Sequence, residues 1–334
     1  MPTAHEMPAM QQPQLGFRVQ HPGEGAGQGQ LWRLPLHSTS FRQYGLSERD
    51  VVIWLPPGYT ELRSYPVIYA FDGQNLMNPS TSFRGMDWQL GAVTSALINK
   101  GAIVPPIIVL LNNIGWPFRY FEYGDTDMGR DHLGWIVNEL KPKVDSAFST
   151  LRGPRHTFAI GSSMGGTAAF LSVWRHPEIF GGAGCLSPVF HLPLLAEVGT
   201  QGRWLGGRQG AHRLYIDNGG DSFEKMAEVQ GWSPEDHYWG RSDIQVGGRG
   251  RAVSPEDHYW GRFDTQLQPG VEAMLAILQL QGMELGSKQL KYFRDSGAHH
   301  SEDAWGARAW RPLQFLLDPL VCDIGDADWG AKHP

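Results

Sequence analysis

The chain has 334 residues, of which 41% are hydrophobic and 19% are charged. This mixture can bury a sizeable core, which excludes a fully disordered chain and a miniprotein held together by disulfides. The 28 basic and 34 acidic residues give a net charge of −6, which argues against nucleic acid as the main partner. No apolar run approaches the ~20 residues that cross a bilayer, so we expect neither a membrane protein nor a membrane partner.

The two ends of the chain and its two cysteines further narrow the class of protein. Residues 1–30 are rich in Gln, Pro and Gly, which predicts a flexible N-terminal arm, and residues 319–334 are predicted to form a similar C-terminal tail. The start lacks the basic and apolar regions of a secretory signal, so we expect a cytoplasmic protein. Cys185 and Cys322 form no CxxC pair, which makes thiolate metal sites and disulfide frameworks poor predictions.

Between these ends, short apolar runs alternate with longer amphipathic stretches. The runs predict strands, in chain order, over Val51–Leu55, Pro66–Phe71, Pro106–Leu111, Thr157–Ile160, Gly182–Leu186, Arg213–Ile216 and Leu290–Phe293. Apolar residues at three- and four-residue spacings predict helices around 87–100, 131–149 (with a kink at Pro142), 164–175, 269–282 and 302–317. This alternation predicts a single α/β domain over residues 31–318, with a mostly parallel central sheet and helices on both faces.

One segment late in the chain is repeated. Ser233–Gln245 and Ser254–Gln266 share the pattern SPEDHYWGR-x-D-x-Q, at an offset of 254 − 233 = 21 residues. Two copies are too few to stack into a solenoid core, so we interpret them as a local duplication inside a surface insertion over about 233–266. The carboxylates and histidines of the pattern could bind a metal. Copying alone explains their similarity, and we predict no metal site.

The motif G-x-S-x-G occurs at residues 161–165, between the strand expected at Thr157–Ile160 and a helix. A sharp strand-turn-helix of this kind needs glycines at both flanks and lifts the Ser163 hydroxyl above the carboxyl edge of the sheet. The N–H of Met164 then points toward the same space, near a helix N-terminus that favours developing negative charge. Ser163 is therefore the candidate nucleophile, while Ser162 occupies the variable position of the motif.

A serine nucleophile needs a base, and the base needs a carboxylate that orients it. In hydrolases with this elbow the chain order is Ser, acid, His. His299 and His300 both qualify as the base, because they follow the strand expected at Leu290–Phe293. The candidates for the acid, after the strand expected at Arg213–Ile216 or farther along the chain, are Asp217, Asp221 and Asp264.

A second donor to an oxyanion is expected in the loop after an earlier strand. The sequence Phe71-Asp-Gly-Gln-Asn75 follows the expected strand Pro66–Phe71 and makes the Gln74 backbone N–H the candidate. Gly73 is expected to let this backbone turn close to the substrate.

Four separated segments together resemble the putative esterase family of α/β-hydrolases, over roughly residues 45–318. They are residues 52–59 (VIWLPPGY), 65–75 (YPVIYAFDGQN), 161–166 (GSSMGG) and 300–305 (HSEDAW). The resemblance implies the α/β-hydrolase fold, with Ser163 as nucleophile, His300 as base, and Gln74 and Met164 at the oxyanion hole. It also selects Asp221 as the acid, although the spacing Gly219-Gly220-Asp221 is one residue shorter than is common in the family. Arg119–Tyr123 resembles the family's R-x-x-E-Y segment, for which a structural ion pair is the alternative interpretation.

The resulting hypothesis is a serine carboxylic-ester hydrolase that needs no cofactor and acts on a small-molecule ester. Trp88 and Trp305 lie near the site segments, as do Trp116 and Tyr120, and suggest an aromatic or sugar-like substrate; Trp88 and Trp305 are the predicted substrate contacts. Two alternatives stay open: acyl transfer by the same triad, and an idle α/β-hydrolase fold that only binds a ligand or partner. The acyl and alcohol groups and the oligomeric state are open at this stage.

Overall fold

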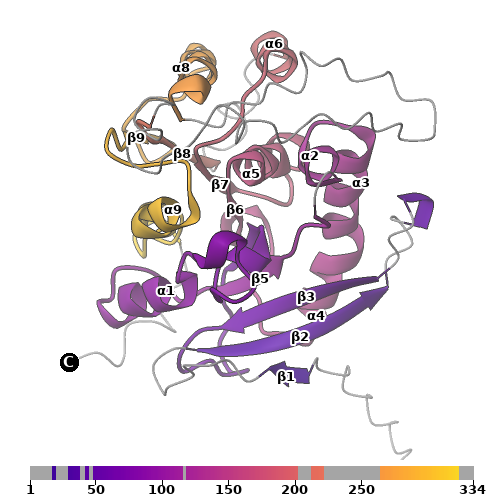
Figure 1. Cartoon of the computed structure of the whole chain (residues 1–334). Helices are drawn as coiled ribbons and strands as arrows, with labels where there is room; N and C mark the ends of the chain where they lie inside the picture. The colour runs from indigo at the N-terminus through magenta and orange to yellow at the C-terminus, as the bar shows by residue number, and fades with distance from the viewer. Residues whose placement is uncertain are drawn as a thin grey trace, which may run out of the picture.

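A computed structural model describes residues 17–19, 29–37, 42–44, 48–115, 118–201, 212–221 and 264–322. In this part of the chain, nine strands form one sheet in the order β1-β2-β3-β5-β4-β6-β7-β8-β9 (Figure 1). The strands are β1 (Phe17–Val19), β2 (Gln30–His37), β3 (Glu48–Leu55), β4 (Val67–Phe71), β5 (Ile107–Leu111), β6 (Thr157–Ser162), β7 (Gly182–Leu186), β8 (Arg213–Asn218) and β9 (Leu290–Arg294). Neighbouring strands from β5 to β9 are parallel, whereas β1, β2, β3 and β5 pair antiparallel.

Helices cover both faces of this sheet. They are α1 (Leu90–Asn99), α2 (Phe118–Tyr123), α3 (Asp127–Trp135), α4 (Lys141–Ala147), α5 (Met164–Arg175), α6 (Leu192–Thr200), α8 (Asp264–Leu280), α9 (Glu302–Arg308) and α10 (Trp310–Leu316). Short helical turns are η1 (Arg42–Tyr44), η2 (Gly73–Asn75), η3 (Phe83–Gly85), the π-helical η4 (Ile136–Leu140) and η5 (Pro154–His156). None of the helices in the described ranges is long and apolar enough to cross a bilayer.

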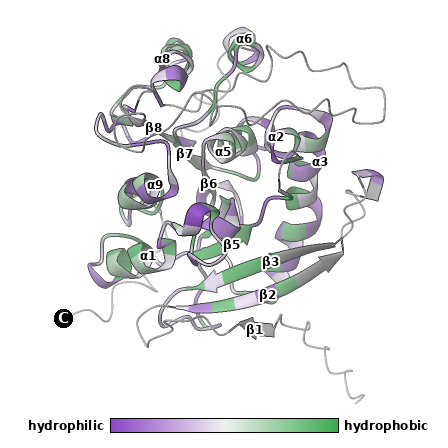
Figure 2. Ribbon diagram, viewed as in Figure 1, coloured by the Kyte–Doolittle hydropathy of each residue, from purple (hydrophilic) through white to green (hydrophobic). Residues whose placement is uncertain are grey.

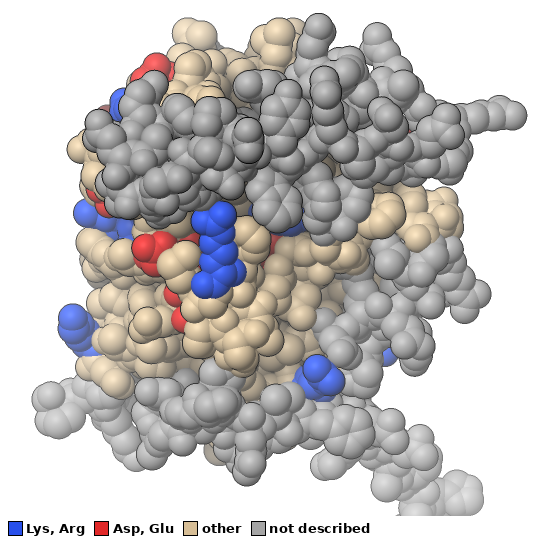
Figure 3. All heavy atoms as spheres, viewed as in Figure 1, with Lys and Arg blue, Asp and Glu red and all other residues tan. Residues whose placement is uncertain are grey.

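The sheet separates two apolar layers. One layer lies between the sheet and helices α3, α4, α5, α6 and α8. The other lies between the sheet and helices α1, α9 and α10. Every residue of β4 and β5 is buried, as expected for central strands that are covered on both faces. The hydrophobic colour of β5 between these layers is visible in Figure 2. The strand directions and the helices on both faces thus confirm the α/β-hydrolase fold and its mostly parallel sheet. On the face in Figure 3, the charged side chains of the described residues lie between wide areas of uncharged surface.

The seven expected strands are all present, and each end lies within three residues of its expected position. The antiparallel strands β1 and β2 were not predicted, and β1 lies inside the segment expected to be a flexible arm. β2 contains a proline and alternates poorly, which are features that count against a strand in sequence patterns. Its pairing with β3 over eight residue pairs overrides these local preferences.

Two helices were also missed. α2 has only six residues, and Pro193 at the start of α6 resembles a turn signal. At the position of the expected kink, Pro142 stands in the first turn of α4, directly after the π-helical turn η4, and the backbone stays helical from η4 into α4. The duplicated insertion lies outside the described residues as far as residue 263, so its interpretation as a surface insertion stays a prediction, as do the domain boundaries.

Candidate active site

The turn between β6 and α5 has the strained geometry expected of a nucleophile elbow. Ser163 lies there with φ 54° and ψ −125°, a backbone conformation that a non-glycine residue adopts only when its surroundings enforce it. A Cβ on Gly161 would lie 2.5 Å from the carbonyl oxygen of Gly165, and a Cβ on Gly165 would lie 2.9 Å from Oδ2 of Asp72. Both flanking positions therefore need glycine, and the half-buried Ser163 hydroxyl is presented at the carboxyl end of the sheet.

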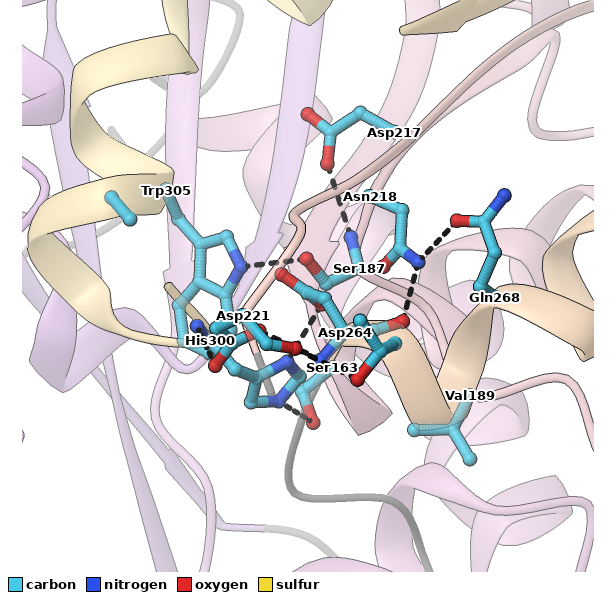
Figure 4. A network of polar contacts seen from close by, with 12 residues as sticks. Ser163, Ser187, Val189, Asp217, Asn218, Asp221, Asp264, Gln268, His300 and Trp305 are labelled. Carbon is cyan, nitrogen blue, oxygen red and sulfur yellow. Dashed lines mark hydrogen bonds and ion pairs between the residues drawn. The ribbon is translucent and has the colours of Figure 1, made fainter. Parts of the chain in front are cut away.

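Three side chains form a continuous line from this hydroxyl into the interior (Figure 4). Nε2 of His300 lies 3.0 Å from Oγ of Ser163, and Nδ1 of the same ring lies 3.0 Å from Oδ1 of Asp264. The imidazole is 12% exposed and the carboxylate is completely buried. The rings of Trp305 and His300 pack edge to face, with 4.7 Å between their centroids. This arrangement can transfer a proton from Ser163 to a base whose orientation is fixed.

The structure brings Asp264, and not Asp221, to the histidine ring, which corrects our expectation. Oδ2 of Asp221 accepts the backbone N–H of His300 at 3.0 Å, and its Oδ1 accepts the backbone N–H of Asp264 at 2.8 Å. Asp221 thus holds together the two segments that carry His300 and Asp264. The physical reason is that both of its oxygens are occupied by main-chain donors.

Asp217 also points elsewhere. Its carboxylate forms a buried ion pair with Arg308 at 3.0 Å and accepts the backbone N–H of Ser187 at 3.1 Å. Burial raises the pKa of Asp217, while the adjacent guanidinium and the two hydrogen bonds act in the opposite direction. Asp217 is therefore a structural partner of Arg308.

The electrostatic setting of Asp264 favours its ionised form. Burial alone raises the pKa of this carboxyl, but the charge of His300, the hydrogen bond to His300 and a hydrogen bond from Ser187 lower it below the usual value. Space around Oδ2 is tight, because a Cβ on Gly219 would lie 2.0 Å from it. Gly219 is consequently the residue that lets the end of β8 approach the carboxylate.

A side chain that we did not anticipate, Ser187, supports Asp264 from behind. Its Oγ accepts hydrogen bonds from Nε1 of Trp305 at 3.0 Å and from Nη2 of Arg308 at 2.8 Å. With both lone pairs occupied, the hydroxyl proton is the group that can turn toward Asp264, and Ser187 is among the causes that lower the pKa of this carboxyl. The residue directly follows β7, the neighbour of β6. Its position at the carboxyl edge of the sheet was a signal that could have identified it.

The predicted oxyanion loop lies against the elbow. Asp72, at the end of β4, adopts a left-handed conformation with φ 59° and starts the turn η2, which contains Gln74. Its Oδ2 would contact a Cβ on Gly165, which places this turn beside the first turn of α5. The first N–H groups of a helical turn have no partner within the turn, which applies to Gln74 in η2 and to Met164 in α5.

An ion pair anchors this loop from below. The guanidinium of Arg119 binds both oxygens of Asp72, at 2.8 Å to Oδ1 and 2.5 Å to Oδ2, and Nδ2 of Asn113 adds a bond of 2.6 Å to Oδ1. The segment Arg119–Tyr123 thus contributes an ion pair, from Arg119 to Asp72. A Cβ on Gly73 would lie 2.7 Å from the carbonyl carbon of Leu110. Its glycine is therefore explained by close approach to β5, where we expected approach to a substrate.

The two tryptophans expected to contact substrate are interior residues, which corrects that prediction. Trp88 is 1% exposed and Trp305 is 5% exposed. Each indole N–H is used inside the protein, by Glu302 at 2.6 Å and by Ser187 at 3.0 Å. Their size and burial make them packing residues that hold polar partners in place. Trp116 lies outside the described residues.

The position of Asp264 also gives the sequence repeat a connection to the site. Asp264 belongs to the second copy of the duplicated pattern, and Asp243 stands at the equivalent place in the first copy, since 264 − 21 = 243. The residues before 264 in both copies lie outside the described part of the chain. The pattern itself does not reveal this connection, although Asp264 is one of the three candidate acids.

Comparisons with known proteins identify esterases among the relatives of this chain. The chain is 29% identical over 146 residues to an endo-1,4-beta-xylanase/feruloyl esterase of Xylanibacter ruminicola, a match that covers 42% of this chain and 20% of that protein. This chain therefore spans only about one fifth of the length of that relative.

Solved structures with the same fold include several esterases. A ferulic acid esterase has a TM-score of 0.59 at 16% identity and covers 87% of this chain and 98% of its own. A ferulic acid esterase of Anaeromyces mucronatus has a TM-score of 0.54 at 17% identity, covering 89% and 93%. The enterobactin esterase of Shigella flexneri has a TM-score of 0.56 at 16% identity, covering 86% of this chain and 59% of its own.

The match to a protein family is broader than these individual relationships. The family described as "Putative esterase" matches residues 46–280, which is more than half of the chain and includes the turn with Ser163, the predicted oxyanion loop and Asp264. His300 lies beyond the matched residues and is placed by the fold. The chain belongs to the putative esterase family.

Proposed function

We propose that the chain hydrolyses carboxylic esters with Ser163 as nucleophile, His300 as general base and acid, and Asp264 as the carboxylate that orients the base. The observation that carries this proposal is the continuous contact from Ser163 Oγ through both ring nitrogens of His300 to Asp264, at 3.0 Å each. A serine hydroxyl is too weak a nucleophile without such a base. The triad role moves from Asp221 to Asp264 for the geometric reason given above.

In the first half of the reaction, Ser163 Oγ attacks the ester carbonyl carbon while its proton moves to Nε2 of His300. Collapse of the tetrahedral intermediate breaks the bond to the alkoxy oxygen, which takes the proton from His300 and leaves as an alcohol. The buried carboxylate of Asp264 stabilises the imidazolium that exists between these two transfers. The product of this half is an ester of Ser163.

In the second half, a water molecule attacks the acyl carbon as His300 removes its proton. The new intermediate collapses, the proton returns to Oγ of Ser163, and a carboxylic acid is released. The negative oxygen of both intermediates is assigned to the backbone N–H groups of Gln74 and Met164. Donors of this kind supply a large part of the rate enhancement, because they are oriented before charge develops.

The names of similar proteins suggest which esters to test. Feruloyl, ferulic acid and enterobactin esterases are among them, and a ferulic acid ester carries an aromatic acyl group. We propose an ester with an aromatic acyl group as the first substrate class. Methyl ferulate compared with p-nitrophenyl acetate and butyrate separates a preference for this class from general esterase activity.

The experiment measures hydrolysis of these three esters by wild type, Ser163→Ala and Ser162→Ala. Ser162→Ala is the matched control, because this adjacent serine ends β6 and lies outside the proposed triad. We expect Ser163→Ala to lose at least about a thousandfold in kcat, in keeping with removal of a covalent nucleophile. Equal rates in wild type and Ser163→Ala would contradict the proposal, and no turnover by a folded wild type would favour the binding-only alternative.

A further inference from the structure

Glu302 lies two residues after the proposed base, in the first turn of α9, and its carboxylate is buried. Its Oε1 accepts a hydrogen bond from Nδ2 of Asn75 at 2.8 Å, and its Oε2 accepts one from Nε1 of Trp88 at 2.6 Å. Asn75 is the residue after the proposed oxyanion donor Gln74. Glu302 therefore joins the loop of His300 to the turn that carries the oxyanion hole.

Asn75 is held on several sides. Its Oδ1 accepts the backbone N–H of Phe83 at 3.1 Å, and its carbonyl oxygen accepts the backbone N–H of Trp88, also at 3.1 Å. Its own N–H donates to the carbonyl oxygen of Asp72 at 2.8 Å. Asn75, Trp88 and Glu302 thus form a closed ring of hydrogen bonds. The bond from the N–H of Asn75 to Asp72 closes the turn whose Gly73–Gln74 peptide carries the N–H of Gln74.

The donors at the two ends of this arrangement cannot change their role. The indole N–H of Trp88 and the backbone N–H of Phe83 can only donate. Between them stand the side chains of Glu302 and Asn75, which contact one another. One carboxylate and one carboxamide satisfy all three hydrogen bonds, whereas two carboxamides leave two N–H groups facing each other. An unsatisfied buried donor of this kind is costly.

We propose that Glu302 and Asn75 form a positioning pair that holds the Gln74 N–H of the oxyanion hole in place, and that the pair requires one carboxylate and one carboxamide. This inference rests on the proposed function, because it assigns a support to the oxyanion hole of the same site. Neither side chain touches the reacting atoms in this assignment. Their effect on the reaction passes through the backbone of Gln74.

Burial and the nearby charge of Asp72 disfavour the ionised form of Glu302, which its two hydrogen-bond donors favour. Burial, followed by the negative charge of Asp72, raises the pKa of Glu302 to about 8, whereas hydrogen bonds from Trp88 and Asn75 and the charge of Arg119 oppose this rise. The two N–H donors fit the ionised form. Assays at about pH 9 therefore examine the state in which the pair is complete.

The test exchanges the two chemical groups between the two positions. Glu302→Gln leaves two carboxamides, and Asn75→Asp leaves two carboxyl groups. The double variant Asn75→Asp with Glu302→Gln restores one of each. In that variant, the carboxamide on α9 accepts from Trp88 and donates to the carboxylate in η2, which also accepts from Phe83. Asp303→Asn is the control, since it removes the exposed carboxylate of the residue next to Glu302 in the same helical turn.

We expect each single change to lower kcat on p-nitrophenyl butyrate by about tenfold or more with little change in KM, as for weakened oxyanion stabilisation. The double variant should recover at least about fivefold relative to each single variant, and Asp303→Asn should match wild type. Two results would overturn the pair: wild-type kcat in Glu302→Gln, or additive losses in the double variant. The melting temperature should follow the same order, which tests the pair without a substrate. Absence of turnover that depends on Ser163 in wild type would instead overturn the proposed function.

Discussion

Oδ1 of Asp264 lies 3.0 Å from Nδ1 of His300, although 36 residues separate them in the chain. The contact exists because β8 and β9 are parallel neighbours, so that the segments following them meet at one edge of the sheet. Asp221 holds both segments by their backbones without touching the ring of His300. The first prediction follows from this difference: Asp264 contacts the ring of His300, whereas Asp221 contacts only backbone N–H groups.

Asp264→Asn should lower kcat by about a thousandfold or more, because an amide stabilises neither the imidazolium nor the required tautomer of His300. Asp221→Asn should cost much less, on the order of tenfold, since it weakens only one of two backbone contacts. Steady-state kinetics on p-nitrophenyl butyrate compares the two variants. A larger loss in Asp221→Asn, with both proteins folded, would return the role of the acid to Asp221.

Ser187→Ala should lower both stability and rate. The change leaves the buried donors of Trp305 and Arg308 without their shared acceptor, at a cost of about 1–3 kcal/mol in the free energy of unfolding. The loss of its hydrogen bond also raises the pKa of Asp264 relative to wild type. Urea unfolding measures the stability, and NMR titration of the Asp264 carboxyl measures its pKa. Unchanged values of both would show that Ser187 does not support Asp264.

The raised pKa of Glu302 predicts a pH-dependent stability. The unfolded chain releases this proton near pH 4.5 and the folded protein near pH 8. Its contribution is therefore complete below pH 4.5 and is lost as the pH rises to about 8, by at most about 1.4 kcal/mol per pH unit. Urea unfolding at several pH values should show a steeper fall for wild type than for Glu302→Gln. An equal pH dependence of the free energy of unfolding in the two proteins would contradict the raised pKa of Glu302.

The elements with local signals were the ones that the sequence predicted well. Ser163 stands between two required glycines, so its motif is a direct record of backbone sterics at the elbow. His300 follows a strand whose position was predicted within one residue. The pairing of His300 with a carboxylate, in contrast, depends on which of several aspartates the end of β8 and the start of α8 present to it.

The errors concerned side chains whose direction no local pattern records. Trp88 and Trp305 were expected at the substrate, but their indole N–H groups serve Glu302 and Ser187 in the interior. The sequence shows that an aromatic residue is near a site segment, but it does not show which way the side chain faces. The antiparallel strand β2 was missed for a related reason, because its stability comes from pairing with β3 and not from its own residues.

The duplicated segment offers a further prediction. Deleting residues 233–253 removes the first copy and joins Trp232 to Ser254, while the second copy with Asp264 stays whole. If Asp264 is the acid, the shortened protein should retain kcat within about threefold of wild type, since loop-length changes are usually tolerated. Circular dichroism checks folding. A folded but inactive deletion variant would show that the first copy contributes to the site.

The central claim is that Ser163 is a nucleophile activated by His300. A fluorophosphonate probe, followed by digestion and mass spectrometry, locates the serine that it modifies. The account predicts modification of Ser163 in wild type, none in Ser163→Ala, and a rate lowered by at least about a hundredfold in His300→Ala. Modification at another serine, or equal labelling of Ser163 with and without His300, would contradict it.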